Sequence, residues 1–152
     1  MWPWRRRVDV VLASSAGDDT IAALTMILRY HRKSVTFDEV RRAIYEDRTG
    51  LPTALDVVHA AERFQLRGRG LAVEEPMQLA HIATPTIAHM MPDRGEFPRP
   101  RDKGLDGYFV VVASISPRRI RWIDPYIGQI AGDHTKFLEL TSGIFLEFRP
   151  DR

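Results

Sequence analysis

Apolar positions in the first half of the chain recur with the spacing of an α-helix. Ile21, Leu24 and Leu28 stand at positions i, i+3 and i+7, which places them on one helical face. Two carboxylates, Asp18 and Asp19, precede this face, where the free N–H groups and the positive end of a helix dipole favour an anion. The pattern predicts a helix from about residue 18 to the cationic residues at 31–33.

Two more helices are indicated by the residues at their N-termini. Thr36 and Glu39 form a capping-box pattern, which predicts a helix to about Glu46. Thr53 follows the loop at 49–52 and is expected to cap a third helix that ends near residue 64. The residues expected to pack inward are Phe37, Val40 and Ile44 in the second helix and Leu55, Val58 and Ala61 in the third.

The second half of the chain has the composition of β-strands. Residues 109–115 form an apolar, β-branched run that is the strongest strand signal in the sequence. Further strands are expected at 68–73, 85–90, 120–123, 129–131 and 143–148, with helical turns at 76–81 and 133–140. Helices followed by an antiparallel meander indicate an α+β fold in a single domain.

Composition narrows the classes of function. The 152 residues carry a net charge of +2, and the arginines are scattered among acidic residues, so nucleic acid is not an expected partner. No apolar run approaches the ~20 residues that span a bilayer. The absence of cysteine excludes disulfides and a cysteine nucleophile. The five histidines lack metal-ligand spacing, and we expect no metal or other cofactor.

Residues 18–30, Asp-Asp-Thr-Ile-Ala-Ala-Leu-Thr-Met-Ile-Leu-Arg-Tyr, resemble the opening of the double-glycine leader peptidases. These are papain-like cysteine peptidase domains of bacteriocin and peptide ABC exporters. The resemblance continues, in the same order, through residues 50–62, 85–89, 107–112, 123–128 and 137–150. It implies the papain-like α+β fold, with N-terminal helices packed on an antiparallel sheet.

The chain departs from this family at the catalytic positions. By the resemblance, the family's cysteine falls on Asp19, its histidine on Tyr108 and its oxyanion-hole glutamine on Ala13, while the third triad residue is kept as Asp124. A carboxylate is a poor amide nucleophile because its attack would form an anhydride. A phenol with a pKa near 10 does not replace imidazole as a base. Hydrolysis by the family's route is therefore not expected.

Simpler roles for these residues remain open. Asp19 suits a helix cap, with contact to a bound peptide as the alternative, and Asp124 before a proline suits the opening of a turn. Tyr108 is placed to fill the former cleft and to donate a hydrogen bond to Asp19 or Asp124. The loop at 92–106, which contains Phe97, is either a lid with a binding surface or a tolerated insertion. We take Phe97, Tyr108 and His89 as the candidate peptide-binding or lid residues.

The resemblance implies a catalytically inactive domain that docks a leader peptide or an unfolded secreted substrate for export. Its other partners would be the transmembrane and ATPase parts of an ABC exporter. Residues 1–152 would then be a single N-terminal domain, cytoplasmic and tethered to the inner membrane by the full-length exporter. Two alternatives are an enzyme with rewired, non-cysteine chemistry in the former cleft and a structural domain for exporter assembly.

Overall fold

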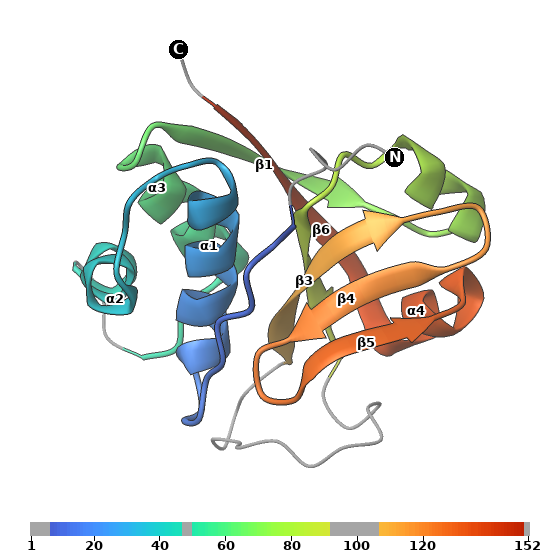
Figure 1. Ribbon diagram of the computed structural model, residues 1–152, viewed down its shortest axis with the longest axis horizontal. Coiled ribbons are helices and arrows are strands. Elements are labelled where there is room, and N and C mark those ends of the chain that lie inside the picture. Colours follow the sequence, from blue (N-terminus) through green and yellow to red (C-terminus); the bar gives the residue numbers. More distant parts are fainter. Residues whose placement is uncertain (1–6, 47–49, 92–106, 151–152) are drawn as a thin grey trace.

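The computed structural model describes residues 7–46, 50–91 and 107–150. Three helices cover one side of a curved sheet, and a fourth helix with a short 3-10 helix closes its other side (Figure 1). The helices are α1 (Asp18–Tyr30), α2 (Phe37–Tyr45), α3 (Ala54–Glu62) and α4 (His134–Leu140), and the 3-10 helix is η1 (Pro76–His81). This arrangement confirms the expected α+β class with helices packed on an antiparallel sheet.

The sheet has six strands in the order β1-β6-β2-β3-β4-β5, and every neighbouring pair is antiparallel. The strands are β1 (Leu66–Ala72), β2 (Thr86–Met90), β3 (Tyr108–Ile115), β4 (Ile120–Asp124), β5 (Gly128–Gly132) and β6 (Thr141–Pro150). The predicted meander is correct for β2 to β5. It is wrong for the last strand, because β6 enters between β1 and β2 instead of following β5.

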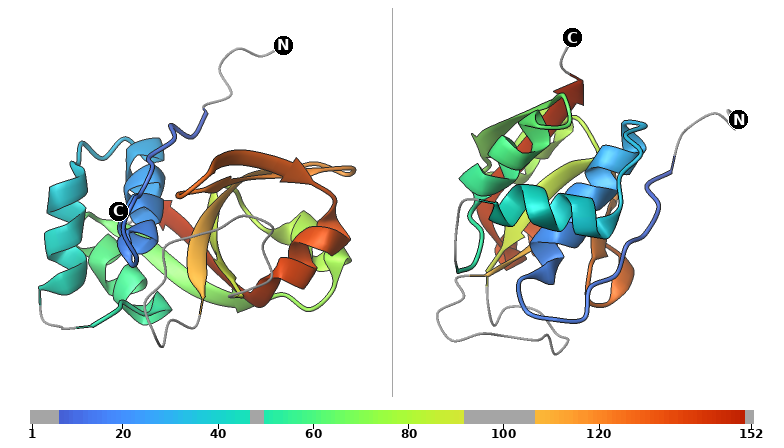
Figure 2. Two further views of the ribbon diagram at one scale, coloured as in Figure 1. Left: turned by 90° about the horizontal axis from the view of Figure 1, so that it is seen from below. Right: turned by 90° about the vertical axis from the view of Figure 1, so that its left-hand side faces the viewer.

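Strand β3 separates two apolar clusters. Phe109 and Val111 belong to the cluster beneath α1, α2 and α3. Tyr108, Val110 and Val112 belong to the cluster enclosed by the curved sheet, α4 and η1. The left view of Figure 2 shows the sheet and these two helices from below. Because side chains alternate between the faces of a strand, a strand covered on both faces needs a continuous apolar run. This is the reason for the strong strand signal in this part of the sequence.

The capping predictions for α2 and α3 are confirmed. Thr36 accepts a hydrogen bond from the backbone N–H of Glu39, whose side chain accepts from the N–H of Thr36 in return. Thr53 and Asp56 make the same reciprocal pair at α3. These bonds satisfy N–H groups that the first helical turn cannot pair internally.

The predicted inward face of α3 is wrong in part. Leu55 is 62% exposed, whereas Val57 and Ala60 are buried with Ala61. Val58 is half-buried against the first cluster. Apolar residues occupy more than one face of this helix, so its rotation is set by packing against β1 and α1, and not by its own pattern.

Candidate functional site

The N-terminus of α1 is capped by a glycine and not by a carboxylate. Gly17 is the N-cap residue with φ of 87°, and no side chain caps the helix. A Cβ atom at this position would lie 3.0 Å from Leu51, so glycine permits both the left-handed backbone and this close approach. The interpretation of Asp19 as a helix cap is therefore wrong. Asp18 lies partly exposed in the first turn, 3.8 Å from the guanidinium of Arg41.

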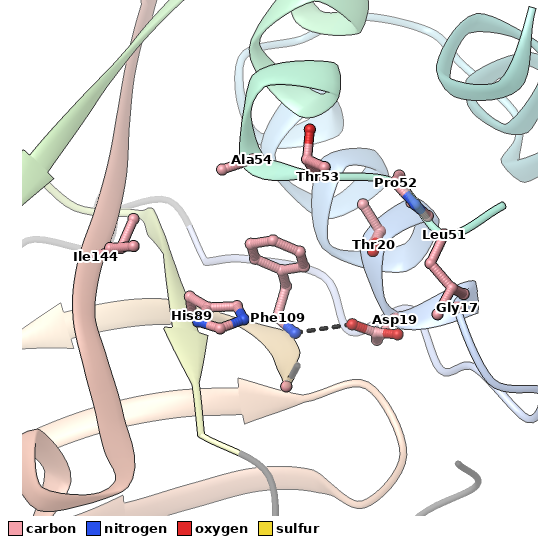
Figure 3. Close-up of a pocket in the computed structure, with 11 residues that line it drawn as sticks. Gly17, Asp19, Thr20, Leu51, Pro52, Thr53, Ala54, His89, Phe109 and Ile144 are labelled. Carbon is pink, nitrogen blue, oxygen red and sulfur yellow. Dashed lines mark hydrogen bonds between the residues drawn. The ribbon is translucent and has the colours of Figure 1, made fainter. Parts of the chain in front are cut away.

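Asp19 joins α1 to two separate parts of the sheet. It is only 2% exposed. Its Oδ2 accepts a hydrogen bond of 2.7 Å from the backbone N–H of Phe109 in β3, drawn as the dashed line in Figure 3. Its Oδ1 lies 2.9 Å from the hydroxyl of Tyr126, which lies in the turn between β4 and β5. That hydroxyl is also 2.9 Å from the carbonyl oxygen of Ser15, so one hydrogen is shared between two acceptors.

Burial raises the pKa of Asp19 above the ordinary value for aspartate. Removal of the carboxylate from water is the largest cause, and the nearby charge of Asp124 acts in the same direction. The hydrogen bonds from Phe109 and Tyr126 stabilise the anion and lower the pKa, but they do not offset the desolvation. The same environment raises the pKa of the Tyr126 phenol, through its own burial and the neighbouring charge of Asp19. Tyr126 therefore stays protonated and acts as a donor.

A pocket of about 310 Å³ opens beside this carboxylate. Figure 3 shows Asp19 on the α1 side of the pocket and Ile144 of β6 on the opposite side, with Phe109 between them. Most of the remaining surface is apolar. The described residues that line the pocket are Gly17, Asp19, Thr20, Leu51, Pro52, Thr53, Ala54, His89, Gly107, Phe109 and Ile144.

His89 in β2 forms part of the same wall. Its Nδ1 lies 2.8 Å from the hydroxyl of Ser142, and its ring packs edge-on against Phe109. Gly107 lies against the other side of the ring, where an added Cβ would be 2.7 Å from His89 Nε2 and 2.2 Å from the carbonyl oxygen of Met90. The imidazole orientation is thus fixed by a hydroxyl on one side and a glycine backbone on the other. The expectation that His89 is a strand residue is confirmed, and His89 lines the same pocket as Asp19.

The other candidate residues lie in different places. Tyr108 is buried in the cluster enclosed by the sheet and is not among the described residues that line the pocket. Asp124 is fully buried, and its Oδ1 accepts the backbone N–H of Tyr126 at 2.9 Å, as the turn interpretation predicts. The N–H of Ala13 donates to the carbonyl oxygen of Pro125 at 2.7 Å. Phe97 and the loop at 92–106 lie outside the described residues.

Sequence reasoning missed Tyr126. The hydroxyl that reaches Asp19 comes from this residue, and the proposed hydrogen bond from Tyr108 to Asp19 or Asp124 stays a prediction. Tyr126 stands two residues after Asp124 in a turn, and nothing local indicates that it contacts a residue more than a hundred positions away. Only the knowledge that this turn lies beside the start of α1 would have identified it.

No group of three or more acidic or histidine side chains within residues 7–46, 50–91 and 107–150 is arranged to hold a metal ion. No helix in the same ranges is long and apolar enough to cross a membrane. The chemistry that the pocket offers is therefore that of one buried carboxylate and one oriented imidazole on an apolar surface.

Comparison with known proteins agrees with the fold. A model of the peptidase C39 family matches residues 7–152. A crystal structure of a double glycine motif protease from an AMS/PCAT transporter, in complex with the leader peptide, is 27% identical. That match covers 97% of this chain and 96% of the other, with a TM-score of 0.73. No curated protein matches the chain.

Two structures of lower sequence identity share the fold. The peptidase domain of Streptococcus ComA, a bi-functional ABC transporter in a quorum-sensing pathway, has a TM-score of 0.76 at 16% identity, covering 95% of this chain and 99% of its own. The N-terminal peptidase C39-like domain of a toxin secretion ATP-binding protein from Vibrio parahaemolyticus has a TM-score of 0.61 at 18% identity, with coverages of 91% and 99%. The papain-like architecture expected from the resemblance is thus confirmed.

Proposed function

The chain belongs to the peptidase C39 family, and from this premise we propose that it docks a peptide segment of an export substrate without cleaving it. The docking surface is the pocket beside Asp19 together with the apolar side chains at its rim. The observation that carries the proposal is the state of the pocket at the start of α1. A hydrogen-bonded carboxylate stands where the resemblance places the nucleophile, while the pocket itself stays open, with about 310 Å³ of volume.

The rim of the pocket supports the docking role. Leu55 at the start of α3 is 62% exposed, and Ile144 in β6 is 46% exposed. Ile144 lines the pocket, and so does Ala54, the residue before Leu55 in the chain. Large apolar side chains exposed next to an apolar pocket are typical of a surface that binds a partner. A solved relative of 27% identity binds a leader peptide, and an extended peptide is the partner that suits this surface.

The chemistry of the site argues against peptide cleavage. The chain contains no cysteine. Asp19 has a hydrogen bond to each carboxylate oxygen, which stabilises the anion and reduces its reactivity as a nucleophile. Tyr108 packs in the sheet-enclosed cluster and carries a phenol, whose ordinary pKa near 10 is unsuited to proton transfer at neutral pH.

We propose further that the domain belongs to an ABC exporter, on the cytoplasmic side of its membrane, where a peptide substrate is collected before transport. The proposed partners are therefore a leader peptide or unfolded secreted substrate and the transmembrane and ATPase parts of that exporter. The rewired-enzyme alternative has one observation in its favour, the raised pKa of Asp19, because perturbed carboxyls are common in active sites. The mainly apolar lining of the pocket favours docking.

The test uses a synthetic double-glycine leader peptide encoded beside this chain, titrated by calorimetry and by tryptophan fluorescence. We expect saturable binding, and mass spectrometry of the recovered peptide should show one intact species after prolonged incubation. A cleaved peptide would overturn the docking proposal in favour of an enzyme. Absence of binding at millimolar peptide would also overturn it.

A matched pair of substitutions assigns the binding to the pocket. Ala54→Trp adds an indole to a residue that lines the pocket. Ala80→Trp makes the same change at an exposed alanine in η1, which is not a pocket residue. Leader binding should be lost in the first variant and kept in the second. Equal loss or equal retention in both would place the peptide elsewhere on the domain.

A further inference from the structure

We infer that the pocket beside Asp19 accepts a cationic side chain, that of lysine or arginine, from the docked peptide. This inference rests on the proposed docking function and specifies the class of residue that enters the pocket. Two features of the pocket carry it. Its walls suit an aliphatic stem, and they include the buried carboxylate of Asp19, while no lysine or arginine is among the described residues of the lining.

The walls between the rim and the carboxylate are apolar. The side chains of Leu51, Pro52, Ala54, Phe109 and Ile144 face the pocket, and Figure 3 shows Ile144 and Asp19 on opposite sides of it. Lysine and arginine carry three or four methylene groups that pack well against apolar surface while the charged head reaches a polar partner. A ligand that enters past Ile144 would bury its stem against Phe109 and bring its head toward Asp19.

The carboxylate can accept further hydrogen bonds. The carboxylate of Asp19 accepts from the Phe109 N–H and the Tyr126 hydroxyl, and its own backbone N–H also acts on it. An ionised carboxylate offers about four acceptor positions, so a further donor from an ammonium or guanidinium group can be accepted. When the Asp19 carboxylate is ionised, the bond to a cation is charge-assisted, and such bonds are shorter and stronger than neutral ones.

The electrostatics of the pocket favour a cation over a neutral group. None of the described lining residues is lysine or arginine, and Arg41 contacts Asp18 in the first turn of α1. The charged group that acts on Asp19 is Asp124, which has the same sign and raises its pKa further. A cation bound at Asp19 would relieve both the desolvation and this repulsion. A neutral aliphatic ligand would leave them unchanged.

The test uses two small probes that isolate the charged head from the rest of a peptide. Butylammonium chloride mimics the lysine side chain, and 1-butanol has the same stem with an uncharged head. Each is titrated at neutral pH into the 15N-labelled chain, with ionic strength matched, and the amide signals of Thr20, Gly107 and Phe109 are followed. We expect butylammonium to bind roughly tenfold more tightly than 1-butanol, the order that one charge-assisted hydrogen bond contributes.

Two variants make the outcome decisive. Asp19→Asn removes the charge and keeps the shape of the side chain. The ratio of the butylammonium affinity to the 1-butanol affinity should therefore fall to near one, while 1-butanol binds as before. Ala54→Trp keeps the charge of Asp19 but fills the pocket. Neither probe should then change the chemical shift of the Phe109 amide. The amide spectrum of each variant without ligand shows whether it is folded.

Equal binding of the two probes, or a preference that survives Asp19→Asn, would overturn the inference. The inference would also be overturned if the leader peptide binds but neither probe changes the amide signals of Thr20, Gly107 and Phe109. In each of these cases the docking function would stand, because it is decided by the leader titration and by the Ala54→Trp and Ala80→Trp pair. Loss of leader binding in those experiments would instead remove the proposed function itself.

Discussion

Replacement of Asp19 by asparagine and by alanine separates the contribution of its hydrogen bonds from that of its charge. An asparagine carbonyl can accept the N–H of Phe109, as Oδ2 of the aspartate does. Its amide can donate to the hydroxyl oxygen of Tyr126, whose own hydrogen then goes to the carbonyl of Ser15. Asp19→Asn therefore keeps the contacts and loses the charge. Asp19→Ala removes both.

The expected cost of Asp19→Ala follows from the partners that it leaves. The N–H of Phe109 lies in the buried part of β3, and a buried donor without an acceptor costs about 1–3 kcal/mol. Tyr126 retains Ser15 as an acceptor, so its hydroxyl adds little to this cost. We expect the free energy of unfolding to fall by about 1–3 kcal/mol in Asp19→Ala and to change by less than about 1 kcal/mol in Asp19→Asn at neutral pH.

The charge of Asp19 gives the wild type a dependence of stability on pH that neither variant shares. Its pKa is raised in the folded protein, so between the ordinary aspartate value of about 3.9 and the higher folded value the native state binds more protons than the unfolded state. Stability from this group is fully present below the unfolded pKa and is lost as pH rises through the folded pKa. The stability of Asp19→Asn relative to the wild type should therefore increase with pH over that window.

The assay is urea denaturation of the three proteins at several pH values between 4 and 8, followed by circular dichroism. The difference between wild type and Asp19→Asn isolates the titration of residue 19, because all other groups cancel. An asparagine variant as unstable as the alanine variant at pH 7 would refute the reasoning about hydrogen bonds. A relative stability of Asp19→Asn that falls as pH rises would refute the reasoning about desolvation.

Three further substitutions test contacts beside the site and away from it. Gly107→Ala should destabilise the protein by more than about 1 kcal/mol, because the backbone has φ of 132° and the new Cβ would be 2.2 Å from the carbonyl oxygen of Met90; thermal unfolding that matches the wild type would contradict this. Glu147→Ala should lower the free energy of unfolding by about 1–3 kcal/mol, and Arg69→Ala should lower it by less than about 1 kcal/mol. The buried Glu147 carboxylate accepts hydrogen bonds from both the guanidinium of Arg69 and the N–H of Ala83, whereas the side chain of Arg69 is 72% exposed. If chemical denaturation gave equal losses of stability for the two variants, the Ala83 bond would contribute nothing.

The parts of the fold that follow from short-range rules could be predicted. Thr36 and Glu39 determine where α2 begins because each satisfies a backbone N–H of the other. The apolar run at 109–115 corresponds to β3 because both faces of that strand are covered. In each case the cause lies within a few residues of its effect, so the sequence alone carries the information.

The parts that depend on distant contacts could not be predicted from these rules. The entry of β6 between β1 and β2 is decided by pairing between residues more than 50 positions apart, as in the bond from the Thr86 hydroxyl to the Leu146 carbonyl. The rotation of α3, which exposes Leu55, depends on which elements lie beneath it. The contact between Tyr126 and Asp19 depends on the β4–β5 turn lying against α1.

The family resemblance located the site that these rules missed, but it did not determine the state of its central residue. A helix N-terminus lowers the pKa of a thiol and so activates a cysteine nucleophile. The same helix end, with hydrogen bonds from Phe109 and Tyr126, would by itself hold the pKa of Asp19 low. Burial outweighs them, and the pKa is raised instead. The carboxylate is therefore held in place but remains poorly compensated, which is unfavourable for an isolated anion and favourable for binding a cation. For this reason we propose the aspartate as the basis of a binding preference.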